Sequence, residues 1–152
     1  DAALLARRCV DSLRASIAGP ITLTFEGRER EAWVAVSVHQ LEQVIVNLVR
    51  NAENALKGRT SGRIAVSVST MGSDAARQVL LAVEDDGPGI KRENLDKLFV
   101  PFFTTSPQGT GLGLSICQKI VEAHDGRMEV ATEEGRFARF TIILPFAKNQ
   151  TV

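Results

Sequence analysis

Apolar residues recur at the three- and four-residue spacing of an amphipathic helix in three stretches of the chain: 2–17, 38–57 and 112–124. A glycine follows each stretch closely, as is common where helices end. The pattern is clearest in the central stretch, whose apolar face consists of Leu41, Val44, Ile45, Leu48, Val49 and Ala52. The sequence therefore predicts three helices, with a further short helix at 92–99.

Short runs of alternating or continuous apolar residues predict strands around these helices. The predicted strands are 21–25, 64–70, 79–85, 127–132 and 139–145, and 33–37 is a short extended piece. One hairpin joins 64–70 to 79–85 across a polar stretch, and a second joins the last two strands. Because strands outnumber helices and do not simply alternate with them, we predict an α+β protein, a two-layer sandwich with a largely antiparallel sheet.

The composition suits a single domain that spans residues 1–152. Apolar residues make up 44% of the chain, and the formal net charge of zero argues against a nucleic-acid binder that relies on a basic face. No apolar run approaches the ~20 residues needed to span a bilayer. Cys9 and Cys117 lie among apolar residues, so we expect buried free thiols rather than a disulfide, and no Cys/His spacing resembles a metal site.

Three asparagines, Asn47, Asn51 and Asn54, lie within the central predicted helix, although asparagine is a poor helix former. At about 100° per residue they form one stripe beside the apolar face. A solvated helix edge, or amides that cap a neighbouring loop, would explain such residues taken singly. A stripe that borders the core also fits the wall of a polar cleft, where an amide oxygen can bind Mg²⁺ beside phosphates.

The strand 79–85 ends in Asp85, which Gly87, Gly89 and Ile90 follow in the segment DDGPGI. An ordinary acidic turn has the same residue types. In the other interpretation the carboxylate accepts a hydrogen bond from a purine amino group, the glycines let a flat ring approach the backbone, and Ile90 forms an apolar wall. This segment alone does not decide between the two.

Glycines alternate with other residues in GTGLGL, residues 109–114, directly before the third predicted helix. The run lacks the Gly-Lys-Ser/Thr ending of a P-loop, and no parallel strand leads into it as in a Rossmann fold. A flexible surface loop is one interpretation. The other is phosphate binding by backbone N–H groups at a helix N-terminus, which the apolar helix behind the run favours.

Taken in order, these segments resemble the catalytic ATP-binding domain of sensor histidine kinases, in the GHKL ATPase superfamily. Four segments carry the resemblance: NLVRNA at 47–52, DDGPGI at 85–90, LFVPFF at 98–103 and GTGLGL at 109–114. They look like the family's asparagine, first glycine, phenylalanine and second glycine boxes. The resemblance covers nearly the whole chain, and four boxes in the family's order make it specific.

The resemblance implies a Bergerat sandwich, with a mixed sheet, three helices on one face and a flexible ATP lid. It implies that Asp85 binds the adenine amino group, that Asn51 coordinates Mg²⁺ and that Asn47 lines the phosphate region as a second catalytic residue. The other nucleotide-binding residues that it implies are Gly87, Gly89, Ile90, Phe99, Phe102, Gly109, Thr110, Gly111, Leu112, Gly113 and Leu114. The glycines of the second box are expected to act as hinge and phosphate contacts of the lid, and the two phenylalanines to anchor it.

The function that the resemblance implies is transfer of the γ-phosphoryl group of Mg-ATP to a histidine on the dimerisation domain of the same full-length kinase, with a response regulator downstream. Neither His39 nor His124 lies in a typical acceptor sequence, so we expect the isolated chain to bind ATP without phosphorylating itself. We expect a cytoplasmic domain, whether or not the whole kinase is membrane-bound, with no nucleic-acid partner and no direct membrane contact.

Two lysines that bind phosphate in many relatives are absent, because Ser106 and Asn54 occupy their positions. Mg²⁺, the helix end and Arg50 or Lys57 are then expected to neutralise the triphosphate, with weaker nucleotide affinity. In the final hairpin, residues 137–138 are Phe-Ala where a glycine and a small hydroxyl residue are common, which affects the expected water network around adenine.

Three other functions remain open. The missing lysines favour a degenerate nucleotide-binding regulatory module. A hydrolysing GHKL ATPase is disfavoured, because such relatives place a glutamate four residues before the magnesium-binding asparagine and this chain has Asn47 there. An anti-sigma-type serine kinase is disfavoured by the phenylalanine box.

Overall fold

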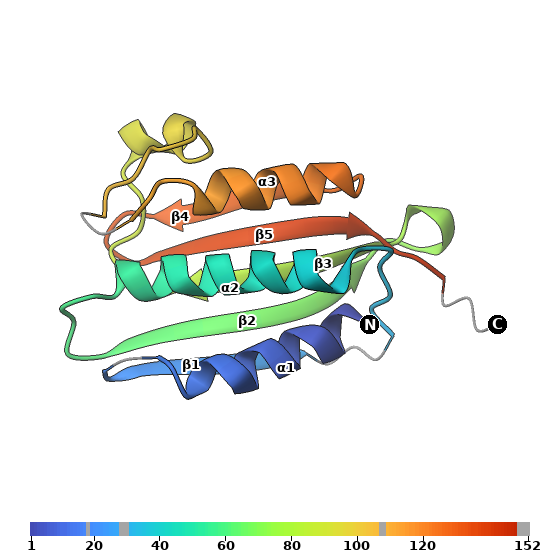
Figure 1. The fold of residues 1–152 in the computed structure, drawn as a ribbon, viewed down its shortest axis with the longest axis horizontal. Helices are drawn as coiled ribbons and strands as arrows, with labels where there is room; N and C mark the ends of the chain where they lie inside the picture. Colours follow the sequence, from blue (N-terminus) through green and yellow to red (C-terminus); the bar gives the residue numbers. More distant parts are fainter. Residues whose placement is uncertain (18, 28–30, 107–108, 149–152) are drawn as a thin grey trace.

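The computed structural model describes residues 1–17, 19–27, 31–106 and 109–148, which fold into two layers (Figure 1). The helices are α1 (Ala2–Arg14), α2 (Val38–Ala55) and α3 (Gly113–Ala123), with 3₁₀ turns at Asp74–Ala76 and Arg92–Lys97. The strands are β1 (Ile21–Gly27), β2 (Gly62–Met71), β3 (Gln78–Asp85), β4 (Arg127–Glu133) and β5 (Phe137–Pro145). The three α-helices lie on the same face of the sheet, as predicted.

The five strands form one mixed sheet in the order β1-β2-β3-β5-β4. β1 and β2 are parallel, whereas the other neighbouring pairs are antiparallel and include both predicted hairpins. The predicted α+β sandwich is therefore confirmed. β3 lies in the centre of the sheet, and its last residue, Asp85, pairs with Ile64 of β2 on one side and Ala138 of β5 on the other.

One hydrophobic core fills the space between the two layers. On β3, Val79, Leu81 and Val83 are buried and alternate with less buried residues, as expected for a strand with one face on the core. The six apolar residues predicted for the buried face of α2 are each at most 3% exposed. Burial of a Val, Leu or Ile side chain stabilises a fold by roughly 1.5–3 kcal/mol, so the asparagine-bearing helix is firmly held against the sheet.

The first predicted helix is shorter in the structure, where α1 ends at Arg14 rather than at residue 17. The hydroxyl and the backbone amide of Ser16 both donate hydrogen bonds to the carbonyl oxygen of Leu13, and this closes the chain into a turn. The second helix likewise ends two residues early, at Ala55, and Gly58 beyond it adopts a left-handed φ of 79°. The middle turns of both helices lie where the sequence predicts them.

Two shorter predictions also changed in detail. The piece at 33–37 joins no strand of the sheet, although the Trp33 carbonyl accepts a hydrogen bond from the Ala147 amide beyond β5. The short helix expected at 92–99 is a 3₁₀ helix over Arg92–Lys97. Both segments are connections between core elements, where helical or strand periodicity has little packing to reinforce it.

Candidate functional site

The direction of two neighbouring helices places the third glycine of GTGLGL beside the asparagine stripe. α2 and α3 run antiparallel: His124, at the end of α3, shares a small cavity with Leu41 near the start of α2. One to two turns earlier in α3, the Cys117 sulfur contacts the carbonyl oxygen of Val44 at 3.8 Å. One further turn back along α3 is Gly113, which therefore lies at the level of the C-terminal half of α2, where Asn51 is located.

The C-terminal end of β3 reaches the same end of the molecule, on the left in Figure 1. Gly87, two residues beyond Asp85, is packed against the last residue of α2: a Cβ at Gly87 would lie 3.5 Å from the Ala55 Cβ and 3.4 Å from the Ala55 carbonyl oxygen. The same Cβ would lie 2.6 Å from Asp85 Oδ1. A side chain at position 87 would therefore fill the space between helix α2 and the Asp85 carboxylate.

Asp85 is a buried carboxylate, with only 2% of the residue exposed. Its Oδ1 accepts a hydrogen bond from the Gly87 amide at 2.9 Å. The pKa of Asp85 is raised to about 6, chiefly by burial; the hydrogen bond from Gly87 lowers it, the neighbouring Asp86 and Glu84 charges raise it, and the Arg59 charge lowers it. A charge kept in so dry a position is costly for folding, which is typical of a group retained for binding.

The loop after β3 is held in place by the β4–β5 hairpin. The Ile90 amide donates to the Thr132 hydroxyl at 2.9 Å, and the Gly135 amide donates to the Pro88 carbonyl oxygen at 2.7 Å. Gly89 has a φ of 70°, and a Cβ there would lie 2.4 Å from the Glu133 carbonyl oxygen. Glycine is therefore required at position 89 for both conformation and space, and the loop presents a fixed backbone edge next to Asp85.

The asparagine stripe borders the core, as predicted: Asn47 and Asn51 are half-buried, whereas Asn54 is exposed. Asn47 lies one turn beyond Val44 on α2, and the Val44 carbonyl oxygen accepts a hydrogen bond from the buried Cys117 thiol of α3 at 3.8 Å. Both cysteines are buried and unpaired, which confirms the sequence prediction. The role of Cys117 was missed, because the spacing of a single apolar-face cysteine gives no sign of which helix it will contact.

The second glycine box forms the start of α3 and the connection before it. Gly113 is the first residue of α3, Leu112 precedes it as the N-cap, and Leu114 packs against the core. Gly109 is half-buried and Thr110 is exposed, with the Thr110 hydroxyl accepting a hydrogen bond from the Leu112 amide at 3.4 Å. Residues 107–108, which belong to the predicted ATP lid, lie outside the described residues.

Phe99 and Phe102 differ in their surroundings, and the prediction that both anchor the lid stays a prediction. Phe99 packs against the core, as expected for an anchor. Phe102 is 75% exposed and has a φ of 69°, an uncommon conformation for a non-glycine residue. It is connected to the glycine box through its backbone instead: its amide donates to the Gly111 carbonyl oxygen at 2.9 Å, which directs the ring outward.

Gly111 is suited to this backbone contact with Phe102. Its φ is 73°, and a Cβ there would lie 2.3 Å from the Phe102 carbonyl carbon. The glycine at the middle of GTGLGL therefore has a structural reason in addition to any contact with phosphate.

Arg50, one of the basic residues expected to neutralise the triphosphate, makes other contacts in the structure. Arg50 donates to Glu53 at 3.1 Å and to the Ser16 hydroxyl at 2.8 Å, so it is directed toward the end of α1 and is a poor candidate for triphosphate binding. Arg59, which the sequence analysis did not select, donates to the Asp86 carbonyl oxygen at 3.0 Å. It follows the glycine beyond α2, in a segment without periodicity, so no pattern identified it.

Ala138 occupies the position beside Asp85 on β5. It is buried, and its methyl group provides no hydrogen bond to the carboxylate. Position 138 therefore provides no hydroxyl partner for Asp85, and the expected effect on a water network around adenine stays a prediction. The neighbouring Thr132 hydroxyl is already used, since it donates to the Phe137 carbonyl oxygen at 2.8 Å and accepts from Ile90.

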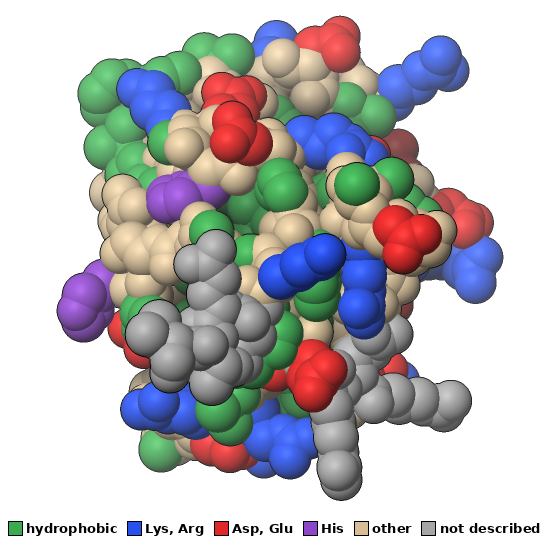
Figure 2. Space-filling model, turned by 90° about the vertical axis from the view of Figure 1, so that its right-hand side faces the viewer, with side chains coloured by type: hydrophobic (Ala, Val, Ile, Leu, Met, Phe, Trp, Pro, Cys, Tyr) green, Lys and Arg blue, Asp and Glu red, His purple; other side chains and the backbone are tan. Residues whose placement is uncertain are grey.

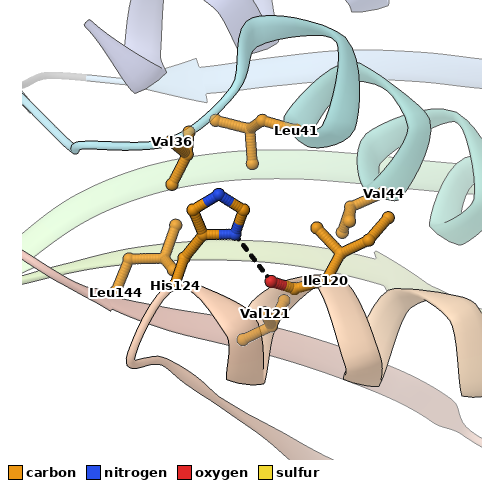
Figure 3. A pocket seen from close by; sticks show the side chains of 7 residues that line it. All are labelled: Val36, Leu41, Val44, Ile120, Val121, His124 and Leu144. Atoms are coloured by element: carbon orange, nitrogen blue, oxygen red, sulfur yellow. Dashed lines mark hydrogen bonds between the residues drawn. The ribbon is translucent and has the colours of Figure 1, made fainter.

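The two best-defined cavities among the described residues lie toward the other end of α2. One is an apolar hollow between α2 and α3, where the His124 ring donates from Nδ1 to the Ile120 carbonyl oxygen at 2.7 Å (Figure 3). The other is a groove between the starts of α1 and α2. Neither includes Asn51, Asp85 or Gly111, so the common cavity expected for these three residues stays a prediction.

The same end of the molecule carries both histidines, drawn in purple in Figure 2. His39 is in the first turn of α2, and His124 is the C-cap of α3. Positive and negative side chains are interspersed on this face, without an extended region of one sign. Within the described part of the chain, no helix is long and apolar enough to cross a membrane.

The sequence is similar to those of known proteins. Residues 36–148 match the family described as "Histidine kinase-, DNA gyrase B-, and HSP90-like ATPase". The chain is 40% identical over 130 residues to the sensor histidine kinase ZraS of Salmonella typhimurium, a match that covers 86% of this chain and 27% of ZraS. It is 38% identical over 111 residues to sporulation kinase E of Bacillus subtilis, covering 73% of this chain and 14% of that kinase.

The fold is also shared with solved structures. The nucleotide-free catalytic domain of histidine kinase ThkA superposes with a TM-score of 0.80 at 34% identity, covering 94% of this chain and 91% of that domain. Full-length ShkA in complex with AMPPNP superposes with a TM-score of 0.82 at 26% identity, covering 97% of this chain and 30% of ShkA. The chain therefore belongs to the histidine kinase-, DNA gyrase B- and HSP90-like ATPase family, as an ATP-binding domain of the histidine kinase type. It spans 27% of the length of ZraS, so the activity of a whole kinase involves segments beyond this match.

Proposed function

We propose that this chain binds Mg-ATP at the end where α2, β3 and α3 converge, and that it donates the γ-phosphoryl group to a histidine on the dimerisation domain of the same full-length kinase. The observation that carries the proposal is the buried Asp85 carboxylate beside Gly87, where no side chain stands between the carboxylate and the end of α2. Family membership supports the nucleotide, and the site geometry supports the roles of individual residues.

The adenine end of the site fits a purine. Asp85 provides an acceptor for the exocyclic amino group, and its burial excludes water that would compete for that hydrogen bond. Gly87 and Gly89 keep the loop surface free of side chains, and Ile90, packed against the core, provides an apolar contact for the ring. A guanine would present a carbonyl oxygen where adenine presents its amino group, so Asp85 selects adenine.

The phosphate end fits a triphosphate with a divalent cation. The half-buried Asn51 provides a neutral amide oxygen as a metal ligand, and Asn47 lies one turn away on the same side of α2. The N-terminus of α3 directs backbone N–H groups toward negative charge. When bound, Mg²⁺ would neutralise part of the triphosphate charge in a site whose lysine positions hold Ser106 and Asn54.

The histidines of this chain are too distant to accept the phosphoryl group in the same molecule. His39 lies 12 residues before Asn51 on one helix, which is about 18 Å along the axis at about 1.5 Å per residue. His124 lies 11 residues beyond Gly113, or about 16 Å. Direct phosphoryl transfer requires reacting atoms about 3–3.5 Å apart, so the acceptor must be brought in by another domain.

The proposal implies particular partners and a location. The dimerisation domain that carries the acceptor histidine belongs to the same full-length kinase, and a response regulator receives the phosphoryl group in turn. The domain acts in the cytoplasm, where ATP is available, and contacts neither nucleic acid nor the membrane directly. The balanced charge and the interspersed surface charges are compatible with these partners.

The test is a phosphorylation assay with γ-³²P-labelled ATP and Mg²⁺, with and without the dimerisation domain of the full-length kinase. We expect acid-labile label on the dimerisation domain and none on this chain alone. Asn51→Ala should abolish transfer, whereas Asn54→Ala, on the exposed part of the same helix, should leave it within twofold. Label on His39 or His124, or equal transfer by the Asn51 variant, would contradict the proposal.

A binding measurement separates the remaining functions. A fluorescent ATP analogue should bind with Mg²⁺ and more weakly without it. Absence of binding at millimolar nucleotide would indicate the degenerate module. Steady release of phosphate without an acceptor domain would indicate a hydrolysing ATPase instead.

A further inference from the structure

We propose that Thr132 is a positioning residue for the adenine end of the site: its hydroxyl ties the backbone of Ile90 to the β4–β5 hairpin and so fixes the apolar wall against which the base would lie. The proposal rests on the proposed function, because the wall has a role only when an adenine nucleotide binds. It assigns a part in binding to a residue of β4 that lies outside the four boxes, 42 residues beyond Ile90.

The strand register places Thr132 in one row with the buried carboxylate. Asp85 of β3 pairs with Ala138 of β5, and Ala138 pairs in turn with Thr132 of β4. Val83 and Phe140, the next residues on the same side of β3 and β5, belong to the core, so the row lies on the face of the sheet that the helices cover. Thr132 therefore provides a hydroxyl at the far end of the row from Asp85, with a methyl group between them.

The two hydrogen bonds of the Thr132 hydroxyl have fixed directions. The Ile90 amide can only donate, so the hydroxyl oxygen accepts from it at 2.9 Å. The Phe137 carbonyl oxygen can only accept, so the O–H group donates to it at 2.8 Å. Each of these bonds polarises the hydroxyl in the sense that strengthens the other. One side chain therefore joins the loop after Asp85 to the β4–β5 hairpin.

The hydroxyl acts at the point where the loop returns to the core. A second contact with the hairpin, from the Gly135 amide to the Pro88 carbonyl oxygen at 2.7 Å, joins backbone to backbone and does not depend on the side chain at position 132. Ile90 packs its side chain against the core, and its amide is part-buried with the Thr132 hydroxyl as its acceptor. Without the hydroxyl this amide would need another acceptor, so the backbone of Ile90 would move while the rest of the loop stayed in place.

The first test needs no nucleotide. Hydrogen exchange of the Ile90 backbone amide should be roughly tenfold faster in Thr132→Val than in the parent chain, because valine has nearly the same shape but accepts no hydrogen bond. Thr132→Ser keeps the hydroxyl and should stay within about threefold of the parent. Thr141→Val is the matched control: Thr141 lies on β5 of the same hairpin, but its neighbours Phe140 and Ile142 are in the core, so it is on the opposite face and should not affect Ile90.

The second test measures the affinity for AMPPNP with and without Mg²⁺. A role at the adenine end predicts that Thr132→Val weakens both affinities by the same factor, about three- to tenfold, because the base is bound in either case. Thr132→Ser and Thr141→Val should each stay within about twofold. In the phosphorylation assay with the dimerisation domain, KM for ATP should rise in Thr132→Val by the same factor while the maximal rate stays within about twofold.

Thr132→Ala is a second variant without a hydroxyl, should valine at this position prevent folding. Three results would overturn the proposal: Ile90 exchange that is unchanged without the hydroxyl, equal affinity losses in the serine and valine variants, or a loss confined to the measurement with Mg²⁺. Absence of nucleotide binding by the parent chain would overturn the proposed function instead, and the exchange measurement would still decide whether Thr132 holds Ile90.

Discussion

Replacing Asp85 with asparagine should stabilise the protein while it weakens nucleotide binding. The carboxylate is buried, and its pKa is raised from 3.8 to about 6, mainly by desolvation. A shift of about two units corresponds to roughly 3 kcal/mol at about 1.4 kcal/mol per unit. The ionised group therefore destabilises the folded state by about 3 kcal/mol at pH 7. Asparagine is nearly isosteric, stays neutral and can still accept the hydrogen bond from Gly87.

The stability gained by Asp85→Asn should depend on pH, and the direction of that dependence follows from the raised pKa of Asp85. A raised carboxyl pKa means that the folded state binds the proton more tightly than the unfolded state, so stability is lost as the pH rises from about 4 through about 6. The advantage of Asp85→Asn should accordingly be about 3 kcal/mol at pH 7 and shrink to about 0.5 kcal/mol at pH 4. The midpoint of thermal unfolding at pH 7 should rise by roughly 6–12 °C.

Urea unfolding followed by circular dichroism at pH 4, 5, 6 and 7 measures this difference, with equal slopes as the check that both proteins unfold to the same state. Glu84→Gln is the control, because it also removes a carboxylate at the end of β3 but one that pairs with Arg139 near the surface. The affinity for Mg-AMPPNP should fall about 10- to 100-fold in Asp85→Asn. An Asp85→Asn advantage that is absent, or equal at pH 4 and pH 7, would refute the reasoning from burial.

Three further predictions concern other parts of the site. Gly111→Ala should speed hydrogen exchange of the Phe102 amide and destabilise the protein by about 1–3 kcal/mol, since its Cβ would clash with Phe102 at a φ of 73°. Gly58→Ala has a similar φ with no neighbour within 4 Å, so a loss as large as that of Gly111→Ala would contradict the role of the clash. Asn51→Ala should reduce Mg²⁺-dependent nucleotide affinity at least tenfold while leaving Mg²⁺-free binding within twofold; titration calorimetry tests both, and equal losses would remove the metal role. Asn47→Glu should raise ATP hydrolysis, measured as phosphate release, and no rise would leave the general-base reasoning unsupported.

The elements that bury a periodic apolar face could be predicted from the sequence. α2 has six such residues on one face, and its position differed from the prediction only at its C-terminus. The hairpins followed from strand patterns on either side of polar connections. The segment at 33–37 has suitable residues for a strand, but its neighbours in space are determined by tertiary packing.

The order of the four boxes predicts the candidate site, whereas contacts between boxes and distant residues could not be deduced. Phe102 is an example: an apolar residue in an apolar box is expected to pack, but its backbone bond to Gly111 turns the ring outward. Thr132 and Arg59 support the loop after Asp85 from other parts of the chain. Their positions depend on strand register and on chain direction beyond α2, which no local pattern encodes.

The central claim is that the end of α2, the end of β3 and the start of α3 form one binding site for Mg-ATP. The most direct measurement is a titration of the ¹⁵N-labelled chain with Mg-AMPPNP, followed by backbone amide shifts. The largest shifts are predicted at Asn51, in residues 85–90 and in residues 109–114. Largest shifts around the cavity lined by Val36, Leu41 and Ile120, with none at Asp85 or Gly111, would contradict the claim.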